Sequence, residues 1–307
     1  RPIGSKQEAW FPTRWSKYRA GEQKRGSLND HLMAWGGTYR LASLQQLDKA
    51  DRDWLASVSP VETEVTLSNR FGTARVELRG ANMRSWRPSG EREVLGRLGV
   101  PVYWPWAIRE GEPGCDIHGL TPYFDWTVKE RTADRVVLAF SDDEVTRRVW
   151  PHRFRAEMEY RIGEALEVEF RATNTDDAPY ACTDLLHPFF DVTHPTNCVV
   201  EGVSGAKYFW KAEADKGGDR VWQGAFPVKS IAGGKPGIVF ERGEGTFTLV
   251  DRDRRISAAF AGGVKFVSYV APDGGVSMET GTIYRDRAYT LAPGETHRVR
   301  ARIAVVR

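Results

Sequence analysis

The chain has 307 residues, of which 41% are hydrophobic and 28% charged, so it can bury a sizeable core and has an ordinary globular composition. Its net charge is only +3, with basic and acidic residues interspersed, which argues against a nucleic-acid partner. No apolar run is long enough to span a membrane. The cysteines Cys115, Cys182 and Cys198 lack metal-ligand spacing and indicate neither a zinc site nor a disulfide framework.

The first 60 residues differ from the remainder. They are polar and basic with scattered tryptophans, and an apolar stripe from Leu44 to Leu55 predicts a helix that Ser43 would cap. We interpret residues 1–60 as a partly helical extension of unknown role, lying across a main domain of residues 61–307.

The start of the chain bears on its location. A first residue Arg1 in place of Met indicates a processed or trimmed chain. The low cysteine content favours the cytoplasm, and a periplasmic or secreted location is the alternative.

Strand patterns dominate after residue 60. Residues 64–67 and 74–78 alternate between apolar and polar side chains and flank a turn at residues 69–72, which predicts a β-hairpin. Strands at such short spacing, with no long helix between them, predict an all-β fold, a large antiparallel sandwich in one domain. Further alternating segments are residues 135–140, 154–162, 166–172, 237–241, 246–250, 256–260, 264–270 and 297–306.

Residues 98–126 are different in kind, because they carry four prolines and several aromatic residues. Such a segment is not regular sheet throughout, and long aromatic loops in a β domain often carry function. Its aromatic residues Tyr103, Trp104 and Trp106 pack in the core or face a ligand, with one or two of them expected in the groove. His118 is a turn residue or a ligand contact.

Two ionisable residues interrupt strand-like segments. His187 lies in the apolar, aromatic run of residues 181–192, where a lone histidine is most often a satisfied core residue. Glu279 lies before Gly281, where it could simply pair with an arginine such as Arg285. Brought together, however, an imidazole and a carboxylate form an acid–base pair.

Six short motifs follow one another in a fixed order: Gly80-Ala81 with Ser85-Trp86, residues 97–106, His118 with Trp126, residues 186–190, residues 201–208, and Met278-Glu279 with residues 291–295. In this order they resemble the aldose 1-epimerase, or galactose mutarotase-like, superfamily. The sequence is most similar to its hexose-6-phosphate 1-epimerase branch. The resemblance covers the chain from about residue 61 to its end and leaves residues 1–60 unexplained.

The resemblance implies a galactose mutarotase-like β-supersandwich with the site in the concave groove of one sheet. By the same resemblance His187 is the general acid and Glu279 the general base. Arg97 would contact a phosphate, His118 the edge of the sugar, and Trp106 would belong to the substrate-binding set. The implied reaction interconverts α and β anomers through ring opening, and it requires no metal or other cofactor.

Departures from the family pattern leave the substrate open. Pro122 stands where a second phosphate-binding arginine is expected, and Val270-Ala271-Pro272-Asp273 replaces a Trp-Asn-Pro-Trp motif. A phosphate dianion held by Arg97 alone would lack its usual second partner. The expected partner is therefore a small sugar or sugar phosphate, with no nucleic acid or membrane partner, and the oligomeric state is not indicated.

Two alternatives to the epimerase stay open on the same fold. One is a non-catalytic carbohydrate-binding domain. The other is a hydrolase or lyase acting on a glycan, which would need a second carboxylate such as Asp184 or Asp191. For the epimerase, we expect His187 to be protonated near neutral pH because it faces an ionised Glu279.

Overall fold

The structure is a computed structural model that describes residues 62–107, 118–211, 219–235, 237–252, 254–271, 274–283 and 288–306. Several sequence-based expectations lie outside these residues: the N-terminal extension with its helix, Cys115, and Arg285 as a partner of Glu279.

The strands form three larger antiparallel sheets and two short pairs. Each strand predicted from alternation is present, and its ends differ from the prediction by at most two residues. The long strands alternate because one face of each packs on the core. In β7, for example, Phe154, Ala156, Met158 and Tyr160 point inward and are buried, whereas the residues between them are not fully buried.

The largest sheet has nine strands in the order β14-β12-β16-β17-β22-β8-β7-β6-β5. Their bounds are β5 Thr127–Arg131, β6 Arg135–Ser141, β7 Phe154–Ile162, β8 Leu166–Asn174, β12 Val199–Glu201, β14 Phe226–Pro227, β16 Gly245–Asp251, β17 Arg254–Ala261 and β22 Thr296–Val306. A three-stranded sheet contains the predicted hairpin, β1 Glu64–Asn69 and β2 Gly72–Glu77, followed by β3 Asn82–Pro88.

A six-stranded sheet has the order β13-β15-β18-β20-β10-β4. Its strands are β4 Val102–Tyr103, β10 Asp184–Leu186, β13 Tyr208–Trp210, β15 Ile238–Phe240, β18 Lys265–Ser268 and β20 Glu279–Thr282. The short pairs join β11 Phe189–Phe190 to β19 Val276–Ser277, and β9 Tyr180–Cys182 to β21 Tyr289–Leu291. Residues 98–126 are mostly irregular, as predicted, but they contribute β4 to this sheet.

In the described part of the chain helices are few and short. The α-helix α5 spans Glu144–Val149 and begins with a capping box. The Asp143 carboxylate accepts hydrogen bonds from two first-turn amides, and the Thr146 hydroxyl accepts one from the Asp143 amide. The 3-10 helices are η1 Thr121–Tyr123, η2 Pro195–Asn197 and η4 Val228–Ser230. Among the described residues no helix is long and apolar enough to cross a membrane.

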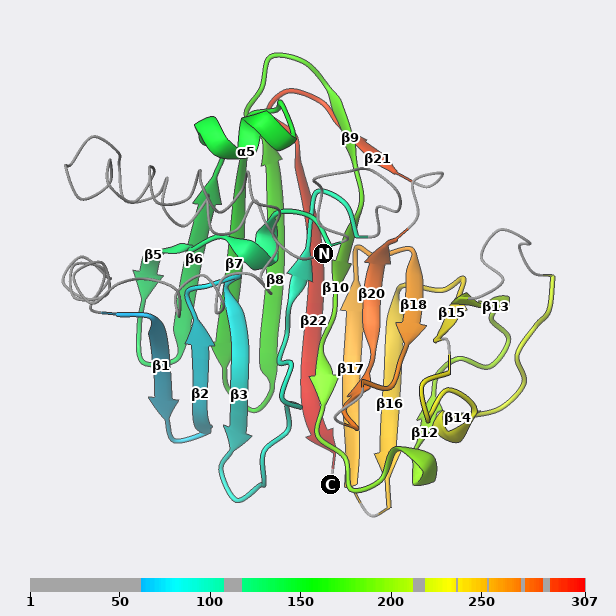
Figure 1. Ribbon diagram of the computed structural model, residues 1–307. Coiled ribbons are helices and arrows are strands. Elements are labelled where there is room, and N and C mark those ends of the chain that lie inside the picture. Colours follow the sequence, from blue (N-terminus) through cyan, green and yellow to red (C-terminus); the bar gives the residue numbers. More distant parts are fainter. Residues whose placement is uncertain are drawn as a thin grey trace, which may run out of the picture.

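The sheets pack as two layers around one main core. In Figure 1 the three-stranded and six-stranded sheets lie in front of the nine-stranded sheet. Ring contacts join the layers: Trp104 beside β4 packs edge-on against Phe154 of β7, and Phe266 of β18 stacks on Phe247 of β16 at 3.9 Å. The large antiparallel all-β sandwich expected from the sequence is confirmed.

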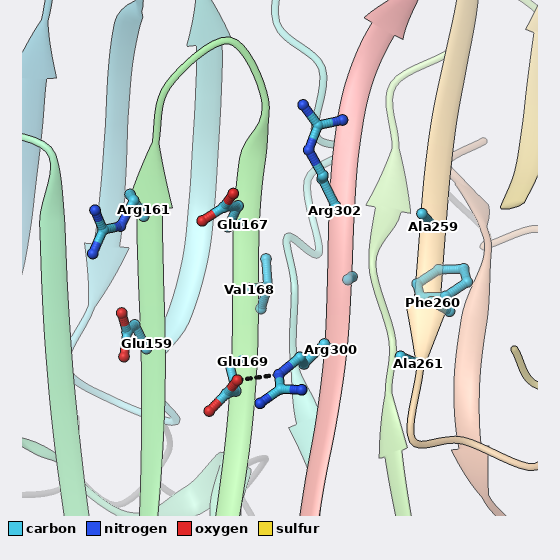
Figure 2. A pocket seen from close by; sticks show the side chains of 11 residues that line it. Glu159, Arg161, Glu167, Val168, Glu169, Ala259, Phe260, Ala261, Arg300 and Arg302 are labelled. Atoms are coloured by element: carbon cyan, nitrogen blue, oxygen red, sulfur yellow. Dashed lines mark hydrogen bonds and ion pairs between the residues drawn. The ribbon is translucent and has the colours of Figure 1, made fainter. Parts of the chain in front are cut away.

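The outer face of the nine-stranded sheet carries charged side chains and one hollow. The hollow has a volume of about 390 Å³ and lies where β17 presents only the small side chains Ala259 and Ala261. Glu167 and Glu169 of β8 and Arg300 and Arg302 of β22 stand along its side (Figure 2).

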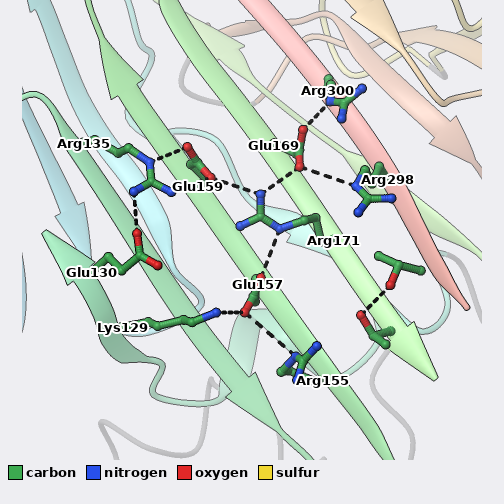
Figure 3. Close-up of polar contacts among 12 residues, drawn as sticks. Lys129, Glu130, Arg135, Arg155, Glu157, Glu159, Glu169, Arg171, Arg298 and Arg300 are labelled. Carbon is green, nitrogen blue, oxygen red and sulfur yellow. Dashed lines mark hydrogen bonds and ion pairs between the residues drawn. The ribbon is translucent and has the colours of Figure 1, made fainter. Parts of the chain in front are cut away.

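Most of the remaining outer face is a network of ion pairs across β5, β6, β7, β8 and β22 (Figure 3). Arg171 lies at its centre, with guanidinium nitrogens 3.1 Å from Glu157, 3.0 Å from Glu159 and 2.8 Å from Glu169. Arg135, on the neighbouring strand β6, contacts Glu159 at 2.5 Å. Cross-strand pairs of opposite charge stabilise neighbouring strands, so we interpret this network as structural.

Candidate active site

The strand register brings His187 and Glu279 together. β10 and β20 are antiparallel, and their last paired residues at this end are Leu186 and Thr280. The next residue on β10's side is His187, and its counterpart on β20 is Glu279. His187 Nε2 lies 3.0 Å from Glu279 Oε1, the distance of an ion pair or hydrogen bond.

Strand periodicity also explains how a histidine fits this apolar segment. Leu186 faces the main core between the sheets, whereas Leu185 belongs to a second, smaller apolar cluster that includes Val267. Since side chains alternate along a strand, His187 points to the same face as Leu185, away from the main core. The acid–base candidates therefore lie on the face of the six-stranded sheet that does not contact the nine-stranded sheet.

Burial sets the charge of this pair. His187 is 7% exposed and Glu279 is 0% exposed. Burial lowers the pKa of His187 to about 4; the carboxylate of Glu279 opposes this shift but does not cancel it, and Lys211 and His118 lower the pKa further. The expectation that His187 is protonated near neutral pH is therefore wrong for the unliganded protein, in which the imidazole is neutral.

The pair has one further hydrogen-bond partner and two atoms without one. Ser277 Oγ donates to Glu279 Oε1, which fixes the carboxylate against His187. Among the described residues, Glu279 Oε2 and His187 Nδ1 have no hydrogen-bond partner although both atoms are buried. Buried polar atoms are nearly always paired, so these two are candidates for contact with a ligand.

Aromatic rings surround the imidazole. Phe189 stacks on His187 with ring centroids 4.3 Å apart, and Tyr103 approaches it edge-on at 5.5 Å. Tyr103 also stacks on His118 at 4.1 Å. Gly119 makes this possible: its φ is +76° and a Cβ there would lie 2.4 Å from the carbonyl oxygen of Trp104. The motif containing His118 thus lies against the ring next to the pair.

The other residues expected in the site have different surroundings. His118 Nδ1 is 2.9 Å from the carbonyl oxygen of Ala107. Trp106 is 7% exposed and packs in the main hydrophobic core, whereas the resemblance had placed it in the substrate-binding set. Arg97 is exposed, and in the described part of the chain no ion pair involves it. Its neighbour Gly96 donates a backbone hydrogen bond of 2.9 Å to Phe189, so the arginine segment adjoins the pair.

The second carboxylates considered for a glycan hydrolase lie elsewhere. Asp184 lies on the side of β10 that faces the core. Its Oδ2 is 2.7 Å from His297 Nε2, but the two atoms are not aligned for a hydrogen bond. Asp191 is 3.4 Å from Arg92 near the surface. Neither carboxylate is paired with the site residues. Within the described ranges no group of three or more His, Cys, Asp or Glu residues could hold a metal ion.

Sequence reasoning missed two neighbours of the pair, Ser277 and Lys211. Ser277 stands two residues before Glu279, so strand alternation would have placed both on one face. Tyr103 was among the aromatic residues expected to pack in the core or face a ligand, but its contacts depend on β4, which was not predicted. Lys211 approaches from the edge strand β13, and no local pattern signals this.

Comparisons with known proteins agree with these features. Residues 63–213 match the family model described as Aldose 1-epimerase. Two curated relatives bear the name "Putative glucose-6-phosphate 1-epimerase" and are 32% identical to this chain. The Salmonella typhimurium protein matches over 162 residues, 47% of this chain and 53% of its own. The Escherichia coli protein matches over 147 residues, which are 42% of this chain and 49% of its own length. The chain thus spans about half the length of these curated relatives.

Solved structures extend the likeness to most of the fold. A crystal structure titled as a "putative mutarotase" from Salmonella typhimurium superposes with a TM-score of 0.68 at 23% identity, covering 80% of this chain and 90% of that one. A galactose mutarotase related enzyme from Lactobacillus acidophilus superposes with a TM-score of 0.69 at 15% identity, covering 80% of this chain and 97% of that one. Over residues 63–213 the chain therefore resembles the aldose 1-epimerase family in sequence, and its sandwich has the galactose mutarotase-like fold.

Proposed function

We propose that this protein is an aldose 1-epimerase that interconverts the α and β anomers of a hexose or hexose 6-phosphate. The observation that carries the proposal is the buried contact of 3.0 Å between His187 Nε2 and Glu279 Oε1. The remaining buried atoms of this pair, Nδ1 and Oε2, have no partner among the described residues. An imidazole and a carboxylate that are held together but incompletely paired are suited to general acid–base catalysis.

In the proposed reaction Glu279 accepts the proton of the anomeric hydroxyl, and His187 in its protonated form donates a proton to the ring oxygen. The bond between C1 and the ring oxygen breaks and an open-chain aldehyde forms. Rotation about C1–C2 presents the other face of the aldehyde. Ring closure returns both protons and yields the other anomer. Ser277 holds Glu279 through Oε1, so Oε2 is the oxygen that would accept the substrate proton.

The low pKa of His187 sets the expected pH dependence. With a pKa of about 4 in the unliganded protein, the imidazolium that donates the proton is a minor species at pH 7. We therefore expect kcat/KM to rise as pH falls from 7 towards 4.

The test is anomer exchange measured by polarimetry and by NMR line broadening on glucose, galactose and glucose 6-phosphate. The native protein should accelerate exchange for at least one sugar, and His187→Asn and Glu279→Gln should each lower the rate by roughly 10²–10⁴-fold. A matched control is Glu157→Gln, which removes a carboxylate from the outer-face network. It should leave the rate unchanged.

Failure of all three sugars to respond, with binding retained, would overturn the epimerase and favour a carbohydrate-binding domain. Acceleration that survives both substitutions would exclude His187 and Glu279 as the acid and base.

A further inference from the structure

Lys211 lies at the end of β13, on the same face of the six-stranded sheet as the catalytic pair. Phe209, two residues earlier, belongs to the apolar cluster on that face, and strand alternation gives Lys211 the same direction. The amide of Lys211 donates a 2.8 Å hydrogen bond to Gly237, and the amide of Ser277 donates one of 2.8 Å to Tyr269. In the register of the sheet, Lys211, Gly237, Tyr269 and Ser277 form one row next to the row of Glu279.

The missing side chain of Gly237 lets the lysine cross this row. A Cβ on Gly237 would lie 3.3 Å from Cδ and 3.4 Å from Cε of Lys211, which is close contact along the lysine stem. The ammonium group continues past Gly237 and lies 5.6 Å from the ring centroid of Tyr269. Tyr269 is in turn hydrogen-bonded to Ser277, whose hydroxyl binds Glu279. The positive charge is thus directed along the sheet towards the catalytic pair.

Lys211 differs from the other lysines near it because no described acidic residue pairs with it. Lys265 on the same face is 3.3 Å from Glu241, and Lys207, directly before β13, is 2.9 Å from Asp219. Over the described part of the chain no carboxylate pairs with Lys211, although it is half-buried. A partly desolvated cation without a counter-ion favours binding of an anion.

We propose that Lys211 holds an anionic group of the sugar substrate beside His187 and Glu279. The inference rests on the proposed function and narrows it to sugars that carry a negative charge, as phosphate or carboxylate. Lysine presents three donors as a compact charge and binds phosphate without the fixed geometry of arginine. Pro122 stands where a second phosphate-binding arginine is expected. Lys211 would supply that second positive charge, opposite the segment that carries Arg97.

The same arrangement connects binding to proton transfer. Lys211 is one of the charges that oppose protonation of His187, after burial itself. A substrate anion paired with Lys211 offsets that charge and favours the imidazolium. A charged sugar therefore promotes protonation of the general acid, whereas a neutral sugar does not.

The experiment compares Lys211→Met, Lys211→Arg and Lys207→Met with the native protein. Lys207→Met is the matched control, because it removes the same charge from the other end of β13. Glucose 6-phosphate, glucuronate and glucose serve as dianionic, monoanionic and neutral substrates. Both kcat and KM for anomer exchange are measured from pH 5 to 8, and binding is measured separately by calorimetry.

Lys211→Met should move the charged and neutral sugars in opposite directions. For glucose 6-phosphate KM should rise about 10-fold, the usual loss for one charged hydrogen bond. For glucose kcat/KM at pH 7 should rise roughly fivefold, because removal of the lysine charge raises the pKa of His187. Lys211→Arg should restore most of the binding, and Lys207→Met should resemble the native protein. A larger effect on glucuronate than on glucose 6-phosphate would identify carboxylate as the preferred anion.

Two outcomes would overturn the proposal. Equal losses of activity for all sugars would show that Lys211 has only a structural role. Unchanged kinetics for the charged sugars would show that Lys211 does not contact the substrate. Calorimetry separates this failure from failure of the epimerase. If no sugar is epimerised but glucose 6-phosphate binds about 10-fold more weakly to Lys211→Met, the anion site stands and the proposed activity falls.

Discussion

The protein contains two clusters of ionisable side chains that differ in how completely they are paired. In the outer-face network, Arg171 contacts Glu157, Glu159 and Glu169, and the latter two each also bind another arginine. The hydrogen bond from Arg135 lowers the pKa of Glu159, against the opposing effect of partial burial. These charges stay ionised because each one has its counter-ions.

The pair formed by His187 and Glu279 is the opposite case. It is more deeply buried, yet two of its polar atoms have no partner in the described structure, and the pKa of His187 is lowered to about 4 by burial. Paired charges at a surface support the sheet, whereas buried groups that lack partners are retained at a cost to stability and mark function. The following predictions test this difference through stability, beginning with the largest effect.

Acid should destabilise the protein through His187. Its pKa is about 4 in the folded state and near 6.5 when unfolded, so between these values the unfolded chain binds the extra proton. The stability held above pH 6.5 is lost as pH falls through 4, on the order of 3 kcal/mol in total. Urea unfolding of the native protein and of His187→Gln across pH 4 to 8 measures this loss. The two curves should diverge below pH 6.5, and parallel curves would contradict the assigned burial effect.

Removal of the central arginine of the network should have a smaller effect. Arg171→Met leaves Glu157, Glu159 and Glu169 close together without their shared cation, and we expect a loss of about 1 kcal/mol at pH 7. Urea unfolding in low and high salt provides the measurement, because screening should shrink the difference. Anomer exchange should stay at the native rate. Arg155→Met is the control, since its single contact with Glu157 is 3.9 Å long.

The smallest effect is expected at the hollow beside β17. In the described part of the protein Arg302 stands at its edge without an ion pair. Arg302→Ala should change the free energy of unfolding by no more than about 0.5 kcal/mol, as usual for an unpaired surface residue. A larger loss in thermal or urea unfolding would show that the hollow contributes to stability.

Much of the fold could be predicted from the sequence, because long strands with one buried face leave an alternating pattern. β7, for instance, begins and ends where the pattern does. Two-residue strands such as β4 carry no such pattern and form only through their partners, so this strand was missed. The matched family segment, residues 63–213, contains His187 but not Glu279, and long-range pairing of β10 with β20 joins them.

The protonation of the pair was less predictable than its residues. Motifs identified His187 and Glu279, but attraction between them was expected to dominate the pKa of His187, and desolvation outweighs it. Desolvation depends in part on rings such as Tyr103, which comes from a separate segment of the chain. A motif names a residue without specifying what surrounds it.

The register of β10 and β20 has a consequence for how this protein can evolve. Single substitutions leave His187 and Glu279 facing each other, but deletion of one residue within either strand would exchange the two faces of that strand. Leu186 or Thr280 would then occupy the site and an ionisable group would enter the core. Insertions and deletions should therefore accumulate outside these two strands, for example in the loops found between residues 191 and 275. Within the strands themselves, an alignment of descendants should be free of gaps.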